Sequence, residues 1–301
     1  MVPALAAGYG HTCGLTDTGA AFCWGWNNLG QLGTGSATNS ATPVAVAGGL
    51  SFSALAAGYA RTCALTSAGA AYCWGLNDHG QLGTGSATNS ATPVAVAGGL
   101  TFRALAPGTI HTCGLTSSGA AYCWGDNYHG GLGTGATTNS ATPVAVAGGL
   151  RFSALTAGGG HTCGLTSAGA AYCWGRNEWG ELGVGSTTNT PTPVAVAGGL
   201  SFSALASGGL HVCGLTSAGS AYCWGTNHWG QLGNGSTTDT PTPVAVAGGL
   251  SFSALAAGSS HTCGLTAAGA AYCWGANNNG ELGTGATTNS ATPVAVVGGL
   301  R

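Results

Sequence analysis

Lysine is absent from this sequence, and charged residues of every kind make up only 4% of its 301 residues. The five basic residues are all arginine, and the formal net charge is −2. A protein that holds nucleic acid or polyphosphate needs a concentrated basic patch, which five scattered arginines do not provide. We therefore expect a protein that has no nucleic-acid partner.

Recognisable catalytic and membrane signals are also missing. The sequence contains no nucleophile elbow, no metal-binding motif and no glycine-rich loop in the strand–helix context that a phosphate cradle needs. The uncharged run at residues 41–55 is broken by proline and paired glycines, so it would make a poor transmembrane helix. We expect no enzymatic activity, no cofactor, no bound metal and no membrane span.

Glycine, by contrast, is abundant, with 58 residues, and the sequence repeats itself every 50 residues without an insertion. Internal repetition of this kind indicates the architecture before any single segment is interpreted. We expect a single domain of six similar units, which span about 1–50, 51–100, 101–150, 151–200, 201–250 and 251–301.

Each unit contains a predicted β-hairpin that has one cysteine in each strand. In the fourth unit the strands are residues 161–166 and 170–174, and the turn ends at Gly169, where a left-handed conformation costs glycine little. Cys163 then lies opposite Cys173, at a separation that a disulfide can span. The same spacing occurs in every unit, at Cys13 and Cys23, Cys63 and Cys73, Cys113 and Cys123, Cys163 and Cys173, Cys213 and Cys223, and Cys263 and Cys273.

The twelve cysteines could also be reduced thiols or metal ligands. A Cys2His zinc site would lack a fourth ligand, and the second unit has Arg61 in place of the histidine. Buried thiols would pack as small apolar side chains. We favour six disulfides within the hairpins, which indicate an oxidising, extracellular or cell-surface location. Because Met1 leads directly into the first unit, we expect any export signal to lie outside this sequence.

Each unit has four strand candidates, which in the second unit are residues 52–56, 61–66, 70–74 and 93–96. Four short antiparallel strands per unit, joined by glycine-rich turns, are typical of a propeller blade. A solenoid is the main competitor, but it would need atypical polar caps at both ends. We therefore predict an all-β fold, a six-bladed β-propeller of four-stranded blades, closed by pairing of residues 293–296 with residues 2–6.

The repeat also carries a family resemblance. The pattern His161-Thr162-Cys163-Gly164-Leu165-Thr166, followed by Tyr172-Cys173-Trp174-Gly175 and by Gly180-Glu181-Leu182-Gly183, resembles the repeat of the regulator of chromosome condensation family. The resemblance covers all six units and implies a β-propeller of four-stranded blades. It leaves the function open, because the family includes a nucleotide exchange factor, a plant ultraviolet photoreceptor and a secreted bacterial β-lactamase inhibitor. This sequence departs from the family in having six repeats rather than seven and two added cysteines per repeat.

Several recurring residues are expected to be structural. The tryptophan of each Cys-Trp-Gly triplet recurs beside an aromatic residue, as expected of packing within the blades. Asn27, Asn77 and their equivalents are expected to hold a loop turn through their side chains. Structural hydrogen bonding is the expected role of the histidines that open the second strand, His11, His111, His161, His211 and His261.

The six copies differ mainly at residues 9–10 and 26–29 of the first unit and at the equivalent residues of the others. The direction of the strands places both segments at the same end of each blade, whereas the turns at the other end are nearly constant. The substituted types include residues that are common in binding hot spots. The expected partner-binding residues are Trp26, Tyr59, His79, Asp126, Tyr128, Arg176, Glu178, Trp179, His228 and Trp229.

We therefore expect a non-enzymatic, monomeric scaffold that binds a protein or peptide through this end of the blades. A multivalent, lectin-like propeller is an alternative, but it would reuse one pocket in every blade, which the varied residues disfavour. An engineered or recently amplified scaffold without a physiological partner is consistent with the near-identity of the copies. One cluster could instead bind a metal or serve acid–base chemistry, namely Asp78, His79, Asp126 and His129.

Overall fold

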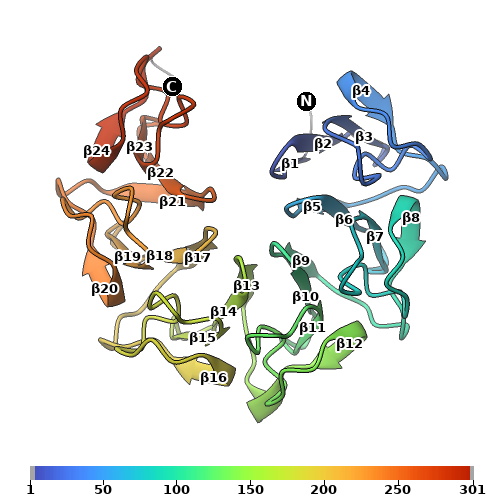
Figure 1. Cartoon of the computed structure of the whole chain (residues 1–301), viewed down its shortest axis with the longest axis horizontal. Helices are drawn as coiled ribbons and strands as arrows, with labels where there is room; N and C mark the ends of the chain where they lie inside the picture. Colours follow the sequence, from blue (N-terminus) through green and yellow to red (C-terminus); the bar gives the residue numbers. More distant parts are fainter. Residues whose placement is uncertain (1–3, 299–301) are drawn as a thin grey trace.

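The computed structural model describes residues 4–298, in which the strands form six separate four-stranded antiparallel sheets. Figure 1 shows these sheets as blades arranged in chain order around a central axis. The only helical segment in the described residues is a single 3-10 turn, η1 (Ala147–Gly149). No helix in this range is long and apolar enough to cross a membrane. The predicted six-bladed β-propeller is thus confirmed.

Every blade consists of four consecutive strands, so the order of strands in each sheet follows the chain. The first strand of each blade lies beside the axis, and in blades one to five it contacts the first strand of the next blade (Figure 1). These inner strands are β1 (Ala4–Ala7), β5 (Ala54–Ala57), β9 (Ala104–Pro107), β13 (Ala154–Ala157), β17 (Ala204–Ser207) and β21 (Phe252–Ala257). The second strands are β2 (His11–Leu15), β6 (Arg61–Leu65), β10 (His111–Leu115), β14 (His161–Leu165), β18 (His211–Leu215) and β22 (His261–Thr266).

The remaining two strands of each blade lead outward from the axis. The third strands are β3 (Ala21–Gly25), β7 (Ala71–Gly75), β11 (Ala121–Gly125), β15 (Ala171–Gly175), β19 (Ala221–Gly225) and β23 (Ala271–Gly275). The outer strands are β4 (Ser40–Ala45), β8 (Ser90–Ala95), β12 (Ser140–Ala145), β16 (Thr190–Ala195), β20 (Thr240–Ala245) and β24 (Ser290–Ala295).

Two strands of the second blade begin more than one residue away from the predicted start, β5 and β8. β5 begins two residues later than predicted, because its ladder with β6 starts at the pair Ala54 and Leu65. β8 begins three residues earlier than predicted, because Gly75 pairs with Ser90 across a register shift in the ladder. The polar segment before the Pro-Val-Ala sequence therefore belongs to the outer strand.

The hairpin register is the one that the cysteine spacing predicted. In the fourth blade Cys163 pairs with Cys173, and Gly164 pairs with Tyr172. All twelve cysteines form six disulfides within their own hairpins, with Cα–Cα distances of 4.0–4.1 Å. The expectation of six disulfides within the hairpins is confirmed.

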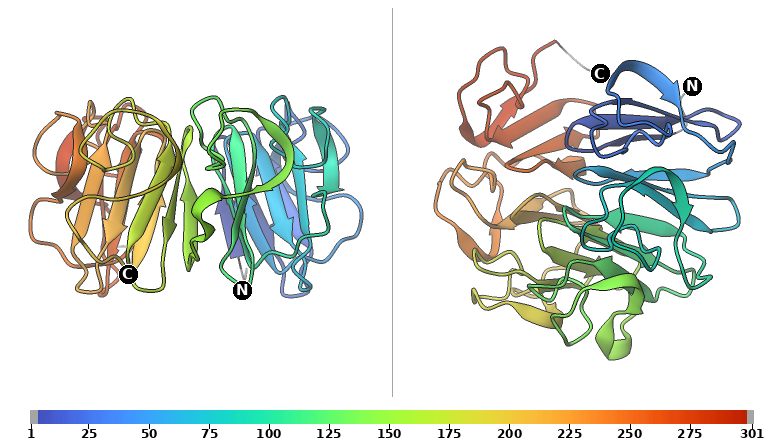
Figure 2. Two further views of the ribbon diagram at one scale, coloured as in Figure 1. Left: turned by 90° about the horizontal axis from the view of Figure 1, so that it is seen from below. Right: turned by 45° about the vertical axis from the view of Figure 1, so that its right-hand side comes forward.

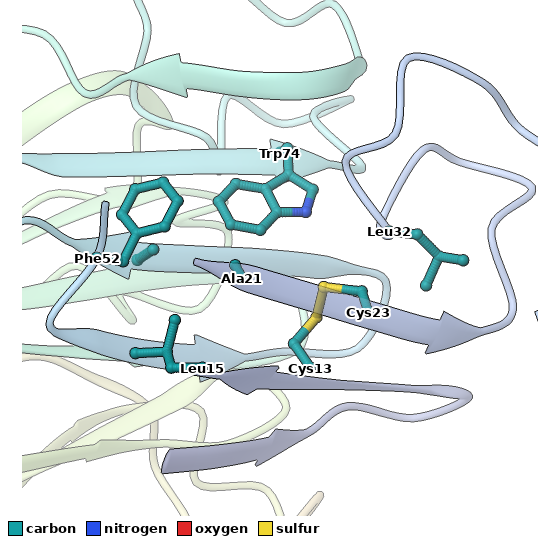
Figure 3. Close-up of a cluster of buried hydrophobic side chains, with 8 residues drawn as sticks. Cys13, Leu15, Ala21, Cys23, Leu32, Phe52 and Trp74 are labelled. Atoms are coloured by element: carbon teal, nitrogen blue, oxygen red, sulfur yellow. A yellow bond between two sulfur atoms is a disulfide. The ribbon is translucent and has the colours of Figure 1, made fainter. Parts of the chain in front are cut away.

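The hydrophobic core lies between the blades rather than inside any one of them. Figure 3 shows the first such core, in which the Cys13–Cys23 disulfide and Leu15 of blade one face Phe52 and Trp74 of blade two. The indole N–H of Trp74 donates to the carbonyl of Gln31 in blade one over 2.9 Å. The recurring tryptophan is therefore a packing residue, as predicted, and it ties each blade to the one before it.

The close approach of one blade to the next depends on glycine. Gly33 has a φ of 72°, and a Cβ atom at this position would lie 2.7 Å from Trp74 Nε1 of blade two. Only glycine adopts this backbone conformation readily and leaves room for the indole. In blades one to five the loop that precedes the outer strand can therefore rest directly on the next blade.

The predicted closure of the ring is wrong in its strand pairing. β24 pairs with β23, and among the described residues β1 pairs only with β2. Residues 2 and 3 of the predicted partner segment lie outside the described residues. The physical reason is that the first blade already has its own outer strand, β4, so it has no vacancy for a strand from the C-terminal repeat.

Candidate functional site

The two variable segments of each blade lie at the same end of the sheet, as predicted. In blade one the backbone N–H of Trp26 donates to the Gly10 carbonyl over 2.7 Å. In blade four the backbone N–H of Arg176 donates to the Gly160 carbonyl over 3.0 Å. Figure 2 shows that the strands run between two opposite faces of the molecule. We call residues 9–10, 26, 28 and 29 of blade one, together with their equivalents in the other five blades, the variable face.

A buried asparagine fixes the backbone of each loop that carries variable residues. The Asn77 side chain donates to the carbonyls of Ser86 and Thr88, each over 2.9 Å, and accepts the Leu82 N–H over 2.8 Å. The equivalent bonds occur in all six blades. The predicted turn-holding role of these asparagines is confirmed, so the variable side chains are displayed on a fixed backbone.

Variable side chains from consecutive blades contact one another. The rings of Tyr9 and Tyr59 lie 4.7 Å apart and join blades one and two. His79 Nδ1 lies 3.6 Å from Asp126 Oδ2 and joins blades two and three. Two further contacts join blades three to five: His129 Nδ1 with Glu178 Oε1 at 3.6 Å, and the rings of Trp179 and His228 at 5.1 Å. Contacts between variable side chains therefore link five consecutive blades.

The large aromatic residues that the sequence placed in the partner site are exposed, by 38% to 76%: Tyr59, Tyr128, Trp179 and Trp229. Three polar residues of the predicted site are also exposed: His79, Glu178 and His228. The other three are half-buried: Trp26, Asp126 and Arg176. Tyr9, which is 69% exposed, was missing from the predicted set, although it occupies the same repeat position as Tyr59.

Arg176 is held by acidic side chains of its own blade. Its Nη2 lies 2.6 Å from Glu178 Oε2, and its Nε lies 3.6 Å from Glu181 Oε1. Glu181 is buried, which raises the pKa of its carboxyl group, and it accepts the N–H of Trp179 over 2.8 Å. Arg176 therefore helps to fix the loop beneath the exposed Trp179 indole.

The possible acid–base cluster on blades two and three is not assembled. His79 lies near Asp78 and Asp126, but His129 lies beside Glu178 of blade four. Within residues 4–298 no group of three or more His, Cys, Asp or Glu side chains is arranged to hold a metal ion. These residues form separate histidine–carboxylate contacts on the variable face.

A cavity of about 300 Å³ lies where the inner strands of all six blades end. It is lined mainly by glycine, alanine and serine, and also by Tyr9, Tyr59 and Thr109 of the variable face. The variable residues therefore border a hollow at the axis.

The repeated histidines are buried between blades, which lowers the pKa of their imidazole groups. The pKa falls to about 4 in His11 and His161 and to about 3 in His111 and His211. These side chains are therefore neutral at physiological pH. His11 Nε2 lies 2.9 Å from Thr62 Oγ1 of the next blade, and the equivalent bonds of His111 and His211 span 2.7 and 2.8 Å. The predicted structural role is confirmed for these three.

His161 departs from this pattern. Both of its ring nitrogens are buried and have no hydrogen-bond partner among the described residues. The reason is that Val212 stands where the other five blades have threonine. One hydrogen bond between blades four and five is therefore missing, and a buried polar group remains unsatisfied.

We expect Val212→Thr to raise the free energy of unfolding by about 1 kcal/mol, because the new hydroxyl would bond to His161 Nε2. Val212 packs in an apolar cluster, so the cost of burying the hydroxyl offsets part of the gain. Urea unfolding monitored by tryptophan fluorescence measures the change. Thr162→Val, which removes the partner of His111, is the matched control and should destabilise by about 1 kcal/mol or more. A less stable Val212→Thr protein would contradict this account of His161.

Comparison with known proteins identifies related propellers. A family model described as the RCC1-like domain matches residues 1–301. Yeast RCC1 (Prp20), solved with Kap60 bound, is 24% identical, with a TM-score of 0.87 over 99% of this chain and 75% of that chain. A second structure of Prp20p from Saccharomyces cerevisiae, described with its binding to Gsp1p and histones, is 24% identical, with a TM-score of 0.84 over 98% of this chain and 77% of that one.

Two further structures extend the comparison. Human WBSCR16 is 23% identical, with a TM-score of 0.89 over 99% of this chain and 83% of that chain. The ectodomain of the receptor kinase CR4 from Physcomitrella patens is 27% identical, with a TM-score of 0.60 over 91% of this chain and 61% of that chain. Because the family model spans the entire sequence, this chain belongs to the RCC1-like domain family.

Proposed function

We propose that this protein binds another protein or a peptide through the variable face and catalyses no reaction. The observation that supports the proposal is the series of four contacts by which variable residues of consecutive blades touch one another. Stable binding between proteins needs a surface of many contiguous residues, which scattered loop positions would not supply.

The centre of this proposed site lies on blades four and five. Trp179 packs edge-on against His228, whose Nε2 lies 3.2 Å from Asp239 Oδ2, and Trp229 is exposed nearby in sequence. Exposed tryptophan is unfavourable in water and is enriched at the energetic centres of interfaces. The Arg176–Glu181 pair holds the Trp179 loop in place, so little ordering entropy is lost on binding.

Family members support the same general activity. Yeast Prp20 forms a complex with Kap60, and its binding to Gsp1p and histones has been described. The six disulfides favour a partner that this protein meets in an oxidising environment. The CR4 ectodomain is a related propeller. A repeated sugar site is disfavoured, because one repeat position holds Leu29, His79, His129, Trp179, Trp229 and Asn279 in turn.

The test is a pull-down from extracellular fractions with the intact chain, followed by affinity measurements on the protein recovered. We expect Trp179→Ala to weaken binding by roughly thirty-fold, because truncation of a central interface tryptophan commonly costs 2 kcal/mol or more. The fold should be unaffected, since the loop is held by Asn177 rather than by the indole.

Ser217→Asn is the matched control, because Ser217 is exposed in a turn at the opposite end of blade five. This substitution should leave the affinity unchanged. A partner whose affinity ignores Trp179 and Trp229 but falls with Ser217→Asn would place the binding site on the constant face instead.

A further inference from the structure

Arg61 opens the second strand of its blade, where the other five blades have histidine. Its side chain has no exposed surface. Nε donates to Thr112 Oγ1 over 3.0 Å, and Nη1 donates to the Thr109 carbonyl over 2.9 Å. Nη2 donates to the carbonyls of Gly108 and His111. The guanidinium group is therefore held by neutral oxygen atoms of blade three.

This buried cation has no carboxylate beside it. Arg61 forms no ion pair within residues 4–298. Burial lowers the pKa of Arg61 to about 9, and the charge of Asp78 opposes this shift, but the Asp78 carboxylate accepts its hydrogen bond from Gln81. Arg61 therefore stays protonated at neutral pH. A buried charge without an opposite charge is unfavourable, so an anion that binds nearby is stabilised by it.

The charge lies directly behind the wall of the cavity at the axis, which we call the axial hollow. Gly58, Gly108 and Thr109 line this hollow, and a Cβ atom on Gly58 would lie 3.3 Å from Arg61 Cζ. Because glycine has no Cβ, the guanidinium group can lie against the backbone of the wall. No acidic side chain is among the described residues that line the hollow. The potential of the buried cation therefore extends into it without a nearby opposing charge.

A backbone N–H in the same wall is free to donate. In three other blades the equivalent N–H donates to the same repeat position of the next blade, as the Gly159 N–H does at the Gly209 carbonyl over 2.8 Å. The Tyr59 N–H makes no hydrogen bond to any described residue, and the equivalent carbonyl, that of Thr109, accepts Arg61 Nη1. An unpartnered N–H close to a buried cation is a favourable donor for a carboxylate oxygen.

A second unsatisfied group lies across the axis. Ser207 lines the hollow from β17, which lies opposite β5 in Figure 1. Its Oγ is buried and has no hydrogen-bond partner in the part of the chain that the structure describes. The other five blades have alanine or proline at this position. A polar atom of a bound ligand would satisfy this hydroxyl.

We propose that the axial hollow binds a small ligand through a carboxylate group, which accepts the Tyr59 N–H and is stabilised by the charge of Arg61. The rest of the ligand lies between Ser207 and the paired rings of Tyr9 and Tyr59, whose centroids are 4.7 Å apart. A hollow of about 300 Å³ is at the lower end of the size of ligand sites, which a few polar groups typically make specific. The carboxylate is the C-terminus of a chain or an acidic side chain.

The test uses small probes, so it is independent of the protein partner proposed above. N-acetylglycine carries a terminal carboxylate, and N-acetylglycine amide is its neutral counterpart. Each is titrated into the unaltered chain at pH 7 and constant ionic strength, while NMR follows the Tyr59 amide and the Arg61 Nε–H. We expect saturable shifts of both signals with N-acetylglycine and at least about tenfold weaker binding of the amide, because hydrogen bonds to charged groups are the stronger ones. N-acetylaspartate α-amide presents a side-chain carboxylate instead, and the tighter of the two acids identifies the source.

Arg61→His is the matched variant, because histidine occupies this position in the other five blades and burial keeps it neutral there. It should retain the near-ultraviolet circular dichroism of the buried tryptophans and weaken N-acetylglycine binding at least about tenfold. Arg103→Ser removes the same charge at the opposite end of blade three, where four other blades have serine, and should leave the affinity unchanged.

Three results would overturn the proposal. They are the absence of a shift at Tyr59 with either acid, equal affinity for N-acetylglycine and its amide, and an affinity that Arg61→His leaves unchanged. The first two are measured on the unaltered chain, so they decide the question even where Arg61→His does not fold.

Discussion

Reduction of all six disulfides is expected to unfold this protein at neutral pH. Each bridge joins cysteines ten residues apart, and a loop of this length contributes about 2–3 kcal/mol in the chain-entropy model. The six together contribute on the order of 15 kcal/mol, which is at the upper end of the net stability of a typical domain. The bridges also lie in the cores between blades, and two thiols need more room than a bonded pair of sulfurs, so reduction disturbs several interfaces at once.

Refolding with and without a reductant tests this expectation directly. Protein that is unfolded and reduced in guanidinium, and then diluted into buffer with excess dithiothreitol, should give no near-ultraviolet circular dichroism from its buried tryptophans. Dilution into a glutathione redox buffer should restore the signal. As a local control, Cys163→Ala combined with Cys173→Ala should cost about 3 kcal/mol and leave five bridges intact. Finding close to twelve free thiols in denatured, unreduced protein would contradict the bridges themselves.

Mild acid is expected to destabilise the protein strongly, through its buried histidines. In the folded state burial lowers the pKa of four of them to about 3 or 4, from about 6.5 in the unfolded chain: His11, His111, His161 and His211. Between these values the unfolded state binds more protons, so stability rises with pH in this range and is fully present above about pH 6.5. At pH 5 the loss is about 2 kcal/mol for each histidine and about 8 kcal/mol for the four.

Few other groups oppose or mimic this effect. The chain has only seven acidic residues, so protonation of carboxylates, the usual cause of acid unfolding, contributes little here. Glu181 acts in the opposite direction, because burial raises the pKa of its carboxyl group in the folded state. The free energy of unfolding should therefore change most steeply in the pH range where histidine, rather than carboxylate, takes up protons in the unfolded chain.

Urea midpoints at pH 7.5 and pH 5.0 measure the effect. His161→Gln should remove about one quarter of the pH dependence, and it is the cleanest choice because His161 has no hydrogen bond to lose within the described residues. His79→Gln changes an exposed histidine and should leave the pH dependence as it is. Equal midpoints at the two pH values in the unaltered protein would show that these histidines are solvated or charged in the folded state.

Local sequence was sufficient to predict the blade. The hairpin register follows from a short turn that ends in glycine and from two cysteines at fixed spacing, so Cys163 and Cys173 pair as their positions require. The bridging role of Asn77 is local as well, since its partners lie within eleven residues. These features depend on contacts close in sequence, and six near-identical copies repeat the same signal.

The sequence also indicated most residues of the candidate site, because the copies differ at few positions. It did not indicate which of these residues contact one another. His129 pairs with Glu178 of the next blade rather than with Asp126, and Arg176 is tied down by a buried Glu181. The first of these contacts joins residues 49 positions apart, and its geometry depends on how one blade is rotated against another.

The sequence by itself determined the repeat, the blade and its disulfides, because these arise from pairings within 50 residues. Only the tertiary structure decided which strand lies at the axis and how the first and sixth blades relate. A periodic sequence specifies the same interface at every step, but the number of steps that completes a turn depends on a small rotation set by side chains such as Trp74 against Gly33. The predicted closure by residues 293–296 was wrong because blade one already has its own outer strand, β4, which the pattern of strands along the chain did not reveal.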